Sequence, residues 1–152
     1  MRILIGLGFA LLLGGCVTAP TPVVVHYPAA TLNGQAMPFS EAVRTGDLLF
    51  VAGQIGNLPG TRTLALGGMA GEARQTLDNM KAVLERHGSS LDHVVKVTVF
   101  LADIKDWPAF NEVYVQYFKG PLPARSALGA NGLALGAKVE VECIATVPPA
   151  EK

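Results

Sequence analysis

Two charged residues near the C-terminus, Arg125 and Glu140, have side chains that could do chemistry together. Arg125 belongs to the run Pro121-Leu-Pro-Ala-Arg-Ser126, and Glu140 belongs to the run Lys138-Val-Glu-Val-Glu142. A guanidinium is a planar fork that matches the two oxygens of a carboxylate, and a nearby carboxylate can orient or deprotonate a water molecule. The pair therefore indicates chemistry on a small organic acid.

Two segments have the residue spacing of amphipathic helices. In residues 72–86 apolar side chains recur at helical intervals and polar ones fill the other face. Gly88 follows where a left-handed cap is needed. A second helix is predicted over residues 106–118, with Asp106 as its N-cap and Pro108 in its first turn. This helix is expected to bury four side chains: Phe110, Val113, Tyr114 and Tyr117.

Six segments are predicted to be β-strands, and their order with the helices gives the fold class. They are residues 23–27, 41–44, 48–53, 94–101, 124–129 and 137–147. Strands joined through one helix tend to be parallel with right-handed crossovers, so both helices are expected on one face of a mixed sheet. The predicted fold is an α+β two-layer sandwich.

The second face of the predicted sheet indicates self-association. Residues 94–101 and 139–147 have apolar side chains at alternate positions on both sides. Two helices can cover one side only, and monomers avoid large exposed apolar patches. We therefore expect other copies of the chain to cover the second face.

The N-terminal residues have the features of a targeting segment. Arg2 precedes an apolar run over residues 3–13 that is too short to span a bilayer as a mature helix. Leu13-Gly-Gly-Cys16 resembles a bacterial lipobox, where a signal peptidase cuts before a lipid-modified cysteine. The alternative is an ordinary secretory signal with a chance cysteine. The lipoprotein interpretation predicts a signal peptide over residues 1–15 and lipidation of Cys16.

The remaining chain is then expected to form one tethered domain. Residues 16–22 would be the lipidated tether, and residues 23–149 are enough for one domain with its own core. Val17, rather than an aspartate, follows the cysteine and favours sorting to an outer membrane. The expected location is the cell envelope, facing the periplasm.

The charge balance argues against nucleic acid as a partner. The chain has 12 Lys and Arg against 12 Asp and Glu residues, and removing residues 1–15 removes Arg2 alone, which leaves 11 basic residues, 12 acidic residues and a net charge of −1. Proteins that bind nucleic acid through its phosphates normally have a basic excess. No nucleic-acid partner is expected.

The cysteines and histidines give no sign of a cofactor. If Cys16 is lipidated, Cys143 has no disulfide partner and is most simply a small buried hydrophobe. His26, His87 and His93 do not have the spacing of a metal-ligand cluster and are expected at solvated or helix-end positions. We expect neither a cofactor nor a metal.

Seven ordered segments between residues 37 and 147 resemble the Rid (YjgF) family of reactive-intermediate deaminases, also labelled endoribonuclease L-PSP. They are Pro38-Phe-Ser-Glu-Ala-Val-Arg44, Leu49-Phe-Val-Ala-Gly-Gln-Ile55, Thr76-Leu-Asp-Asn-Met-Lys-Ala-Val-Leu84, Val94-Val-Lys-Val-Thr-Val-Phe-Leu-Ala-Asp103, Phe110-Asn-Glu-Val-Tyr114, Pro123-Ala-Arg-Ser126 and Val139-Glu-Val-Glu142. The resemblance implies a homotrimer in which three sheets form a central barrel, with the helices outside and a pocket in each cleft between subunits.

The resemblance also implies an activity and roles for individual residues. The substrates would be 2-imino acids and their enamine tautomers, hydrolysed to 2-keto acids and ammonia. Arg125 would bind the substrate carboxylate, and Glu140 would position the water. The implied substrate-binding residues are Phe39, Gly53, Asn111 and Ala127, the last through its backbone N–H.

The chain departs from the family pattern at several positions. Many members have tyrosine where this chain has Phe39, cysteine where it has Ala127 and serine where it has Ala52. The expected pocket is therefore less polar than usual, which indicates a bulkier and more apolar imino acid. These departures also keep open a second function, a non-catalytic module that binds small carboxylates or a partner protein.

Each functional assignment has a structural alternative. Arg125 could form a salt bridge between subunits, and Asn111 could make a structural bond on its helix. Glu142 lies two residues after Glu140 and would share its face of the strand, so either carboxylate could be the structural one.

Overall fold

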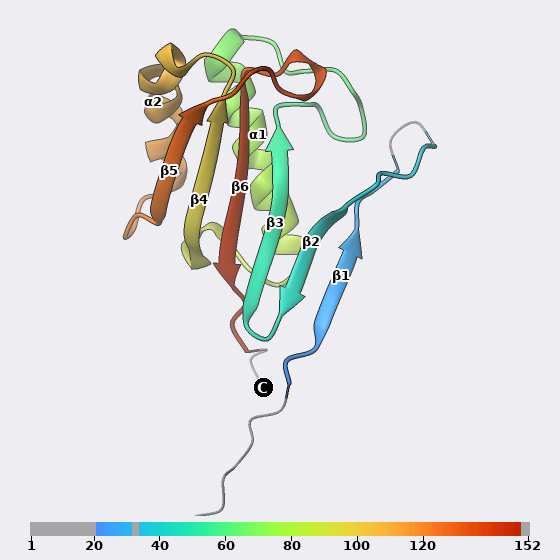
Figure 1. The fold of residues 1–152 in the computed structure, drawn as a ribbon. Helices are drawn as coiled ribbons and strands as arrows, with labels where there is room; N and C mark the ends of the chain where they lie inside the picture. The colour runs from blue at the N-terminus through green and yellow to red at the C-terminus, as the bar shows by residue number, and fades with distance from the viewer. Residues whose placement is uncertain (1–20, 32–33, 150–152) are drawn as a thin grey trace, which may run out of the picture.

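The protein's structure, a computed structural model, describes residues 21–31 and 34–149. Cys16 and the predicted signal peptide lie outside these residues, as does most of the predicted tether. The described strands are β1 (Val24–Pro28), β2 (Ser40–Thr45), β3 (Leu48–Ile55), β4 (Val94–Leu101), β5 (Ala124–Gly129) and β6 (Val139–Thr146). These residues also form two α-helices, α1 (Gly68–Arg86) and α2 (Trp107–Tyr117), and three short 3₁₀ turns. Figure 1 shows their arrangement.

The strands form one six-stranded mixed sheet in the order β1-β2-β3-β6-β4-β5. Strand β6 pairs antiparallel with both β3 and β4, so β3 and β4 run parallel without being neighbours. The α2 crossover joins β4 to its parallel neighbour β5. The predicted α+β class and element order are therefore confirmed.

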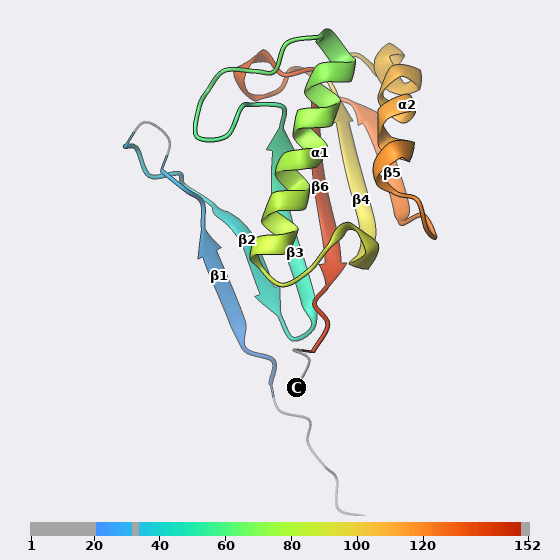
Figure 2. The same ribbon diagram turned by 180° about the vertical axis from the view of Figure 1, so that it is seen from behind.

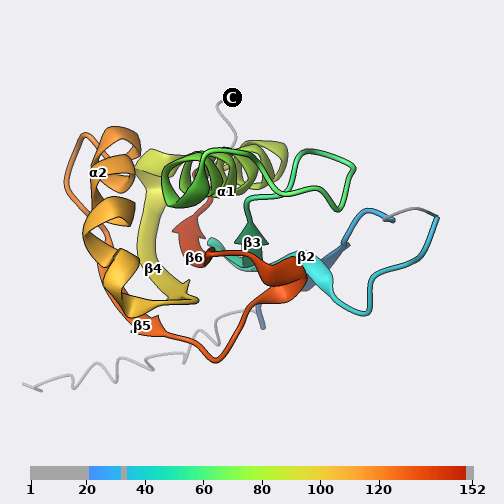
Figure 3. The ribbon, with the colours of Figure 1, turned by 90° about the horizontal axis from the view of Figure 1, so that it is seen from above.

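Both helices lie on one face of the sheet, as Figures 2 and 3 show from behind and from above. The sequence alternation explains this, because every second residue of β6, and of β4 from Val97 onward, is apolar and points to the helices. Their side chains pack on the apolar stripe of α1, and each fully buried Val or Leu contributes about 1.5–3 kcal/mol. The centre of this core comprises Ala73, Leu77, Met80, Leu84, Val97, Val99, Leu101, Val139, Val141 and Cys143. Cys143 is thus the buried hydrophobe that was expected.

Two predicted helix details differ from the structure. Helix α1 begins at Gly68, before the predicted residue 72, because Gly67 and Gly68 adopt φ angles of 104° and 62° and turn the chain into the helix. Asp106 makes no capping hydrogen bond at α2. Instead the Asp103 carboxylate accepts a 2.9 Å bond from the Lys105 backbone N–H in the turn before it.

One further side chain, Tyr117 of α2, is half-buried rather than buried. Its hydroxyl donates to Asp78 Oδ1 at 2.9 Å, at the surface between the helices. Neither helix in the described part of the chain combines the length and apolarity that crossing a bilayer requires.

No described helix covers the second face of the sheet (Figure 1). This face carries polar as well as apolar side chains. The registers place Lys96, Thr98 and Glu142 on it, among the apolar residues that were expected there. This face also carries apolar side chains, and Leu48, Phe50 and Leu128 are among those that remain exposed. The prediction of an apolar second face is therefore correct only in part. We call this surface the open face.

Candidate functional site

Arg125 lies on edge strand β5 and points to the helix-covered face, because it pairs with the fully buried Val97. Its guanidinium carbon lies 4.5 Å from the centre of the Tyr114 ring on α2. No described carboxylate forms an ion pair with it. A guanidinium fixed on an aromatic ring, but not paired with an anion, is available to bind one.

The Tyr114 ring that supports Arg125 is rigidly held. It is only 4% exposed and stacks on Phe118 with ring centres 4.5 Å apart. Burial raises the pKa of its hydroxyl, although the positive charge of Arg125 opposes this. The helical pattern of the sequence predicts Tyr114 only as a buried helix residue. Its contact with Arg125 depends on how α2 packs on β5, which helical spacing does not reveal.

Two other predicted site residues accompany Arg125. Ala127 pairs with Val99 and so points to the same face of β5 as Arg125. Asn111 lies one turn before Tyr114 on α2. The Asn111 Oδ1 and Tyr114 hydroxyl atoms are buried without a hydrogen-bond partner in the described structure. We call Asn111, Tyr114, Arg125 and Ala127 the arginine half-site.

Glu140 lies on β6 and points to the open face, opposite Phe100 of β4. Gly53 allows its carboxylate to lie directly on the backbone of β3, because a Cβ atom at position 53 would be 2.8 Å from the Glu140 Cδ. The start of β6 is fixed by the Glu72 Oε2, which accepts a 2.7 Å bond from the Lys138 backbone N–H. Burial raises the pKa of Glu140, and the nearby charge of Glu142 adds to the effect.

Glu140 lines a cavity of about 390 Å³, and Phe39 and Gly53 also line it. Most of its other walls are apolar. The cavity is lined among others by Met37, Ile55, Ala134 and Leu135, with Glu41 and Arg62 as its other charged residues. We call this the glutamate half-site. Glu142 shares the open face but borders a different and smaller cavity with Phe50 and Lys96, so the geometry favours Glu140 for chemistry.

The structure does not bring Arg125 and Glu140 together within one protomer. The Arg125 side chain lies on the face of the sheet that the helices cover, whereas the Glu140 side chain lies on the open face of the same sheet. Arg125 and Glu140 therefore do not form a pair within a single chain. Pairing them requires two copies, one for each half-site, and the pocket between subunits that the resemblance implies stays a prediction.

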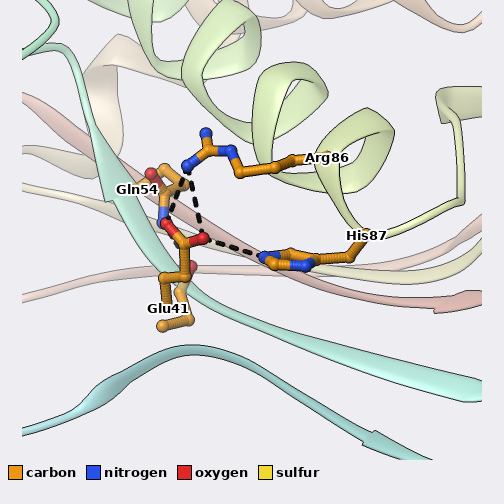
Figure 4. A network of polar contacts seen from close by, with 5 residues as sticks. Glu41, Gln54, Arg86 and His87 are labelled. Carbon is orange, nitrogen blue, oxygen red and sulfur yellow. Dashed lines mark hydrogen bonds and ion pairs between the residues drawn. The ribbon is translucent and has the colours of Figure 1, made fainter. Parts of the chain in front are cut away.

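A polar network fixes the β2 wall of the glutamate half-site (Figure 4). The Glu41 carboxylate accepts bonds from Arg86 Nη1 at 3.1 and 3.2 Å and lies 2.8 Å from His87 Nε2. The His87 ring also stacks on Tyr27, with centres 4.0 Å apart. His87 is thus at a helix end, as predicted, but it is not solvated. The network ties β1 and β2 to the end of α1.

Replacing Glu41 with Ala is expected to lower the free energy of unfolding by about 1–3 kcal/mol, since it removes charge-assisted bonds from a largely buried carboxylate. Chemical denaturation of the two proteins measures the difference. A matched control is Glu85→Ala, which removes the partner of the exposed Lys81 and should change stability by less than about 0.5 kcal/mol. Equal effects of the two changes would show that the network is only a surface contact.

Two features of the glutamate half-site were not predicted from sequence. Arg62 follows a turn-forming stretch that gives no sign of a nearby pocket. Leu135 adopts φ 58°, which no sequence pattern predicts for a leucine. Within the described residues, no three His, Cys, Asp or Glu side chains are grouped as a metal site requires.

Comparison with known proteins gives one family and many relatives. Residues 31–147 match the family described as Endoribonuclease L-PSP. The human protein named 2-iminobutanoate/2-iminopropanoate deaminase is 42% identical over 120 residues, which span 79% of this chain and 88% of the human protein.

Solved structures agree with this match. The crystal structure of yeast Mmf1 has a TM-score of 0.74 at 34% identity and covers 83% of this chain and 100% of Mmf1. RidA from the Antarctic bacterium Psychrobacter sp. has a TM-score of 0.70 at 37% identity, covering 80% of this chain and 94% of RidA.

Proposed function

This chain belongs to the Rid (YjgF) family, described as Endoribonuclease L-PSP, and we propose that it hydrolyses 2-imino acids and their enamine tautomers to 2-keto acids and ammonia. The observation that supports this most directly is the unpaired guanidinium of Arg125, fixed on Tyr114. Relatives named as deaminases of 2-iminobutanoate and 2-iminopropanoate support the same reaction class.

The proposed reaction needs a fixed carboxylate and an oriented water. Arg125 holds the substrate carboxylate through two parallel N–H···O bonds. Glu140 accepts a proton from water as the water oxygen bonds to the imine carbon, the C=N electron pair moves to nitrogen, and Glu140 returns the proton to that nitrogen. The hydroxyl proton of the resulting carbinolamine then passes through Glu140 to the amino nitrogen, and the C=O bond forms as the C–N bond breaks to release ammonia. General-base catalysis of this kind contributes about 10²–10⁴-fold to a rate.

We propose that a homotrimer completes the site. In a cyclic trimer each interface is heterologous, so it joins two different surfaces of the same chain. This symmetry lets the arginine half-site of one copy meet the glutamate half-site of the next. The exposed apolar residues of the open face support the same assembly, since burial against other copies removes them from water.

Keto-acid release tests the proposed activity. An amino-acid oxidase generates the imine in situ, and the protein should accelerate formation of the 2-keto acid above the rate of spontaneous hydrolysis.

The second candidate function is a non-catalytic carboxylate-binding module. Phe39 favours it, because this residue lines the cavity but has no hydroxyl group that could bind substrate or water. Calorimetric binding of a 2-keto acid without any acceleration would establish that alternative.

We also propose that the trimer is anchored in the cell envelope through a lipid on Cys16. The motive is the apolar run that ends directly in this cysteine. Three anchors hold a trimer far more firmly than one. Full-length protein should partition into the detergent phase, and Cys16→Ser should move it to the aqueous phase. Unchanged partitioning would reject lipidation.

The pH dependence of the reaction should report the raised pKa of Glu140. The base must be ionised, so kcat/KM should rise with pH through this pKa. Since the charge of Glu142 raises the pKa, Glu142→Gln should move the acidic limb of the profile to lower pH. Ionisation of the substrate is the same for both proteins, so the difference reports the enzyme. Glu112→Gln, on the exposed side of α2, is the control. An unmoved limb with Glu142→Gln in an intact trimer would contradict the assignment.

A further inference from the structure

Leu135 has an unusual backbone conformation beside the glutamate half-site. Its φ and ψ angles are 58° and 11°, which lie in the left-handed region. In the described part of the chain, every other residue with a positive φ angle is a glycine. A Cβ atom is unfavourable there, and glycine would adopt the same conformation without strain. Strain of this kind persists where a side chain is needed for function or where the surroundings enforce it.

The turn that holds Leu135 is anchored on its C-terminal side. The Ala137 backbone N–H donates to the Ala134 carbonyl at 3.0 Å, and the Ala137 side chain is buried. Lys138 follows and is bound to Glu72 of α1. Leu135 itself remains 40% exposed and is not part of the hydrophobic core. Core packing therefore does not explain why a leucine occupies this position.

The side chain of Leu135 instead borders the same cavity as Glu140 and Phe39. Phe39 is 50% exposed, so both residues present apolar surface that the protomer leaves uncovered. In the proposed reaction the substrate carboxylate binds to Arg125 of a neighbouring copy, and the imine carbon lies within reach of a water on Glu140. The substituent on that carbon is then left to contact the apolar walls of the cavity.

We propose that Leu135 and Phe39 form the binding site for the substrate side chain and select imino acids with branched aliphatic or aromatic side chains over those with one or two carbons. This inference rests on the proposed deaminase function. The preference is hydrophobic in origin, because a larger side chain covers more of the two exposed apolar surfaces.

One charged residue of the cavity favours a different substrate. Arg62 is exposed and could bind a distal carboxylate, which would favour imino acids derived from aspartate or glutamate. Glu41 is already bound to Arg86 and His87, so it does not neutralise a substrate charge. The apolar walls outnumber this single cation, and we therefore assign the apolar class.

Relative turnover of a substrate panel tests the inference. We compare kcat/KM for imines generated from leucine, phenylalanine, alanine and aspartate, using the wild type, Leu135→Gly and the control Leu66→Ala. Leu66 is 94% exposed and is not a wall of the cavity. Leu135→Gly should lower the leucine-to-alanine ratio of kcat/KM by about tenfold or more. It should also raise the melting temperature, because glycine relieves the left-handed strain.

The outcomes separate this inference from the proposed function. If the wild type accelerates hydrolysis of none of the imines, the proposed function fails. If it accelerates them but Leu135→Gly keeps the wild-type ratio, the side-chain site alone is rejected. A wild-type preference for the alanine or aspartate imine would also overturn the inference, and the aspartate result would point to Arg62.

Discussion

Replacing Arg125 with Ala is expected to reduce kcat/KM for 2-imino acid hydrolysis by about ten- to hundredfold, the value of one charge-assisted interaction with the substrate carboxylate. Arg125→Lys should not restore activity. Lysine keeps the charge, but it loses the planar fork and the flat contact with the Tyr114 ring. Steady-state kinetics with the leucine imine measure both effects.

The same variants separate substrate binding from a purely structural role. If Arg125 formed a salt bridge between subunits, Arg125→Ala would weaken the oligomer, and its mass in solution would fall. The substrate-binding role predicts an unchanged oligomer with lost activity. Full activity of Arg125→Lys would show that charge alone is sufficient and would reject the bidentate contact.

Much of the fold could be predicted because its elements have strong local patterns. Strand β4 agrees with the predicted residues 94–101, since this segment is rich in β-branched residues and Val97, Val99 and Leu101 are buried at alternate positions. The start of α1 could not be predicted in the same way. Gly71 must lack a side chain because a Cβ atom there would overlap the Leu66 carbonyl, and this close approach exists only in the folded chain.

The order of the strands in the sheet could not be predicted from the sequence for a similar reason. Strand β6 lies between β3 and β4, which are joined through α1, and it comes from the far C-terminal end of the chain. Its position is determined by long-range packing rather than by local residue preference. The sequence pattern correctly predicted parallel β3 and β4 but could not show that a later strand separates them.

The residue types of the candidate site were identifiable from sequence, but their division between two faces was not. The face of each residue depends on strand register: Arg125 pairs with a buried valine, whereas Glu140 pairs with Phe100 on the open face. A shift of one residue in either strand would exchange these faces. Register is a property of the assembled sheet, so the resemblance could imply a pocket between subunits, but the placing of the two side chains on opposite faces became evident only in the structure.

Replacing Glu140 with Gln should nearly abolish turnover, with a loss of about 10²–10⁴-fold in kcat, because the base is removed while its shape is kept. Gly53→Ala should have a similar but smaller effect, since its added methyl group displaces the Glu140 carboxylate. Both losses should appear in kcat more than in KM. Retained activity of Glu140→Gln would assign the base elsewhere.

Glu140→Gln should leave the protein as stable as the wild type, or more so, at neutral pH. The folded-state pKa of Glu140 is raised above its unfolded value, so the native state binds the proton more tightly. The free energy of unfolding therefore falls as the pH rises through the raised pKa. A neutral glutamine avoids this loss. Melting curves at neutral pH thus distinguish lost chemistry from lost folding.

The strongest test combines the two inactive variants in one oligomer. If each site takes Arg125 from one copy and Glu140 from the next, random mixing of Arg125→Ala and Glu140→Gln chains in equal amounts should leave roughly a quarter of the sites with both residues intact. Those sites should have wild-type activity, although both parent variants are strongly impaired. Co-expression with two different tags, followed by purification through both, isolates the mixed trimers for assay. Arg125 and Glu140 lie on opposite faces of one sheet, so they can act together only across a subunit boundary. Mixed trimers without recovered activity would therefore show that the two half-sites do not meet.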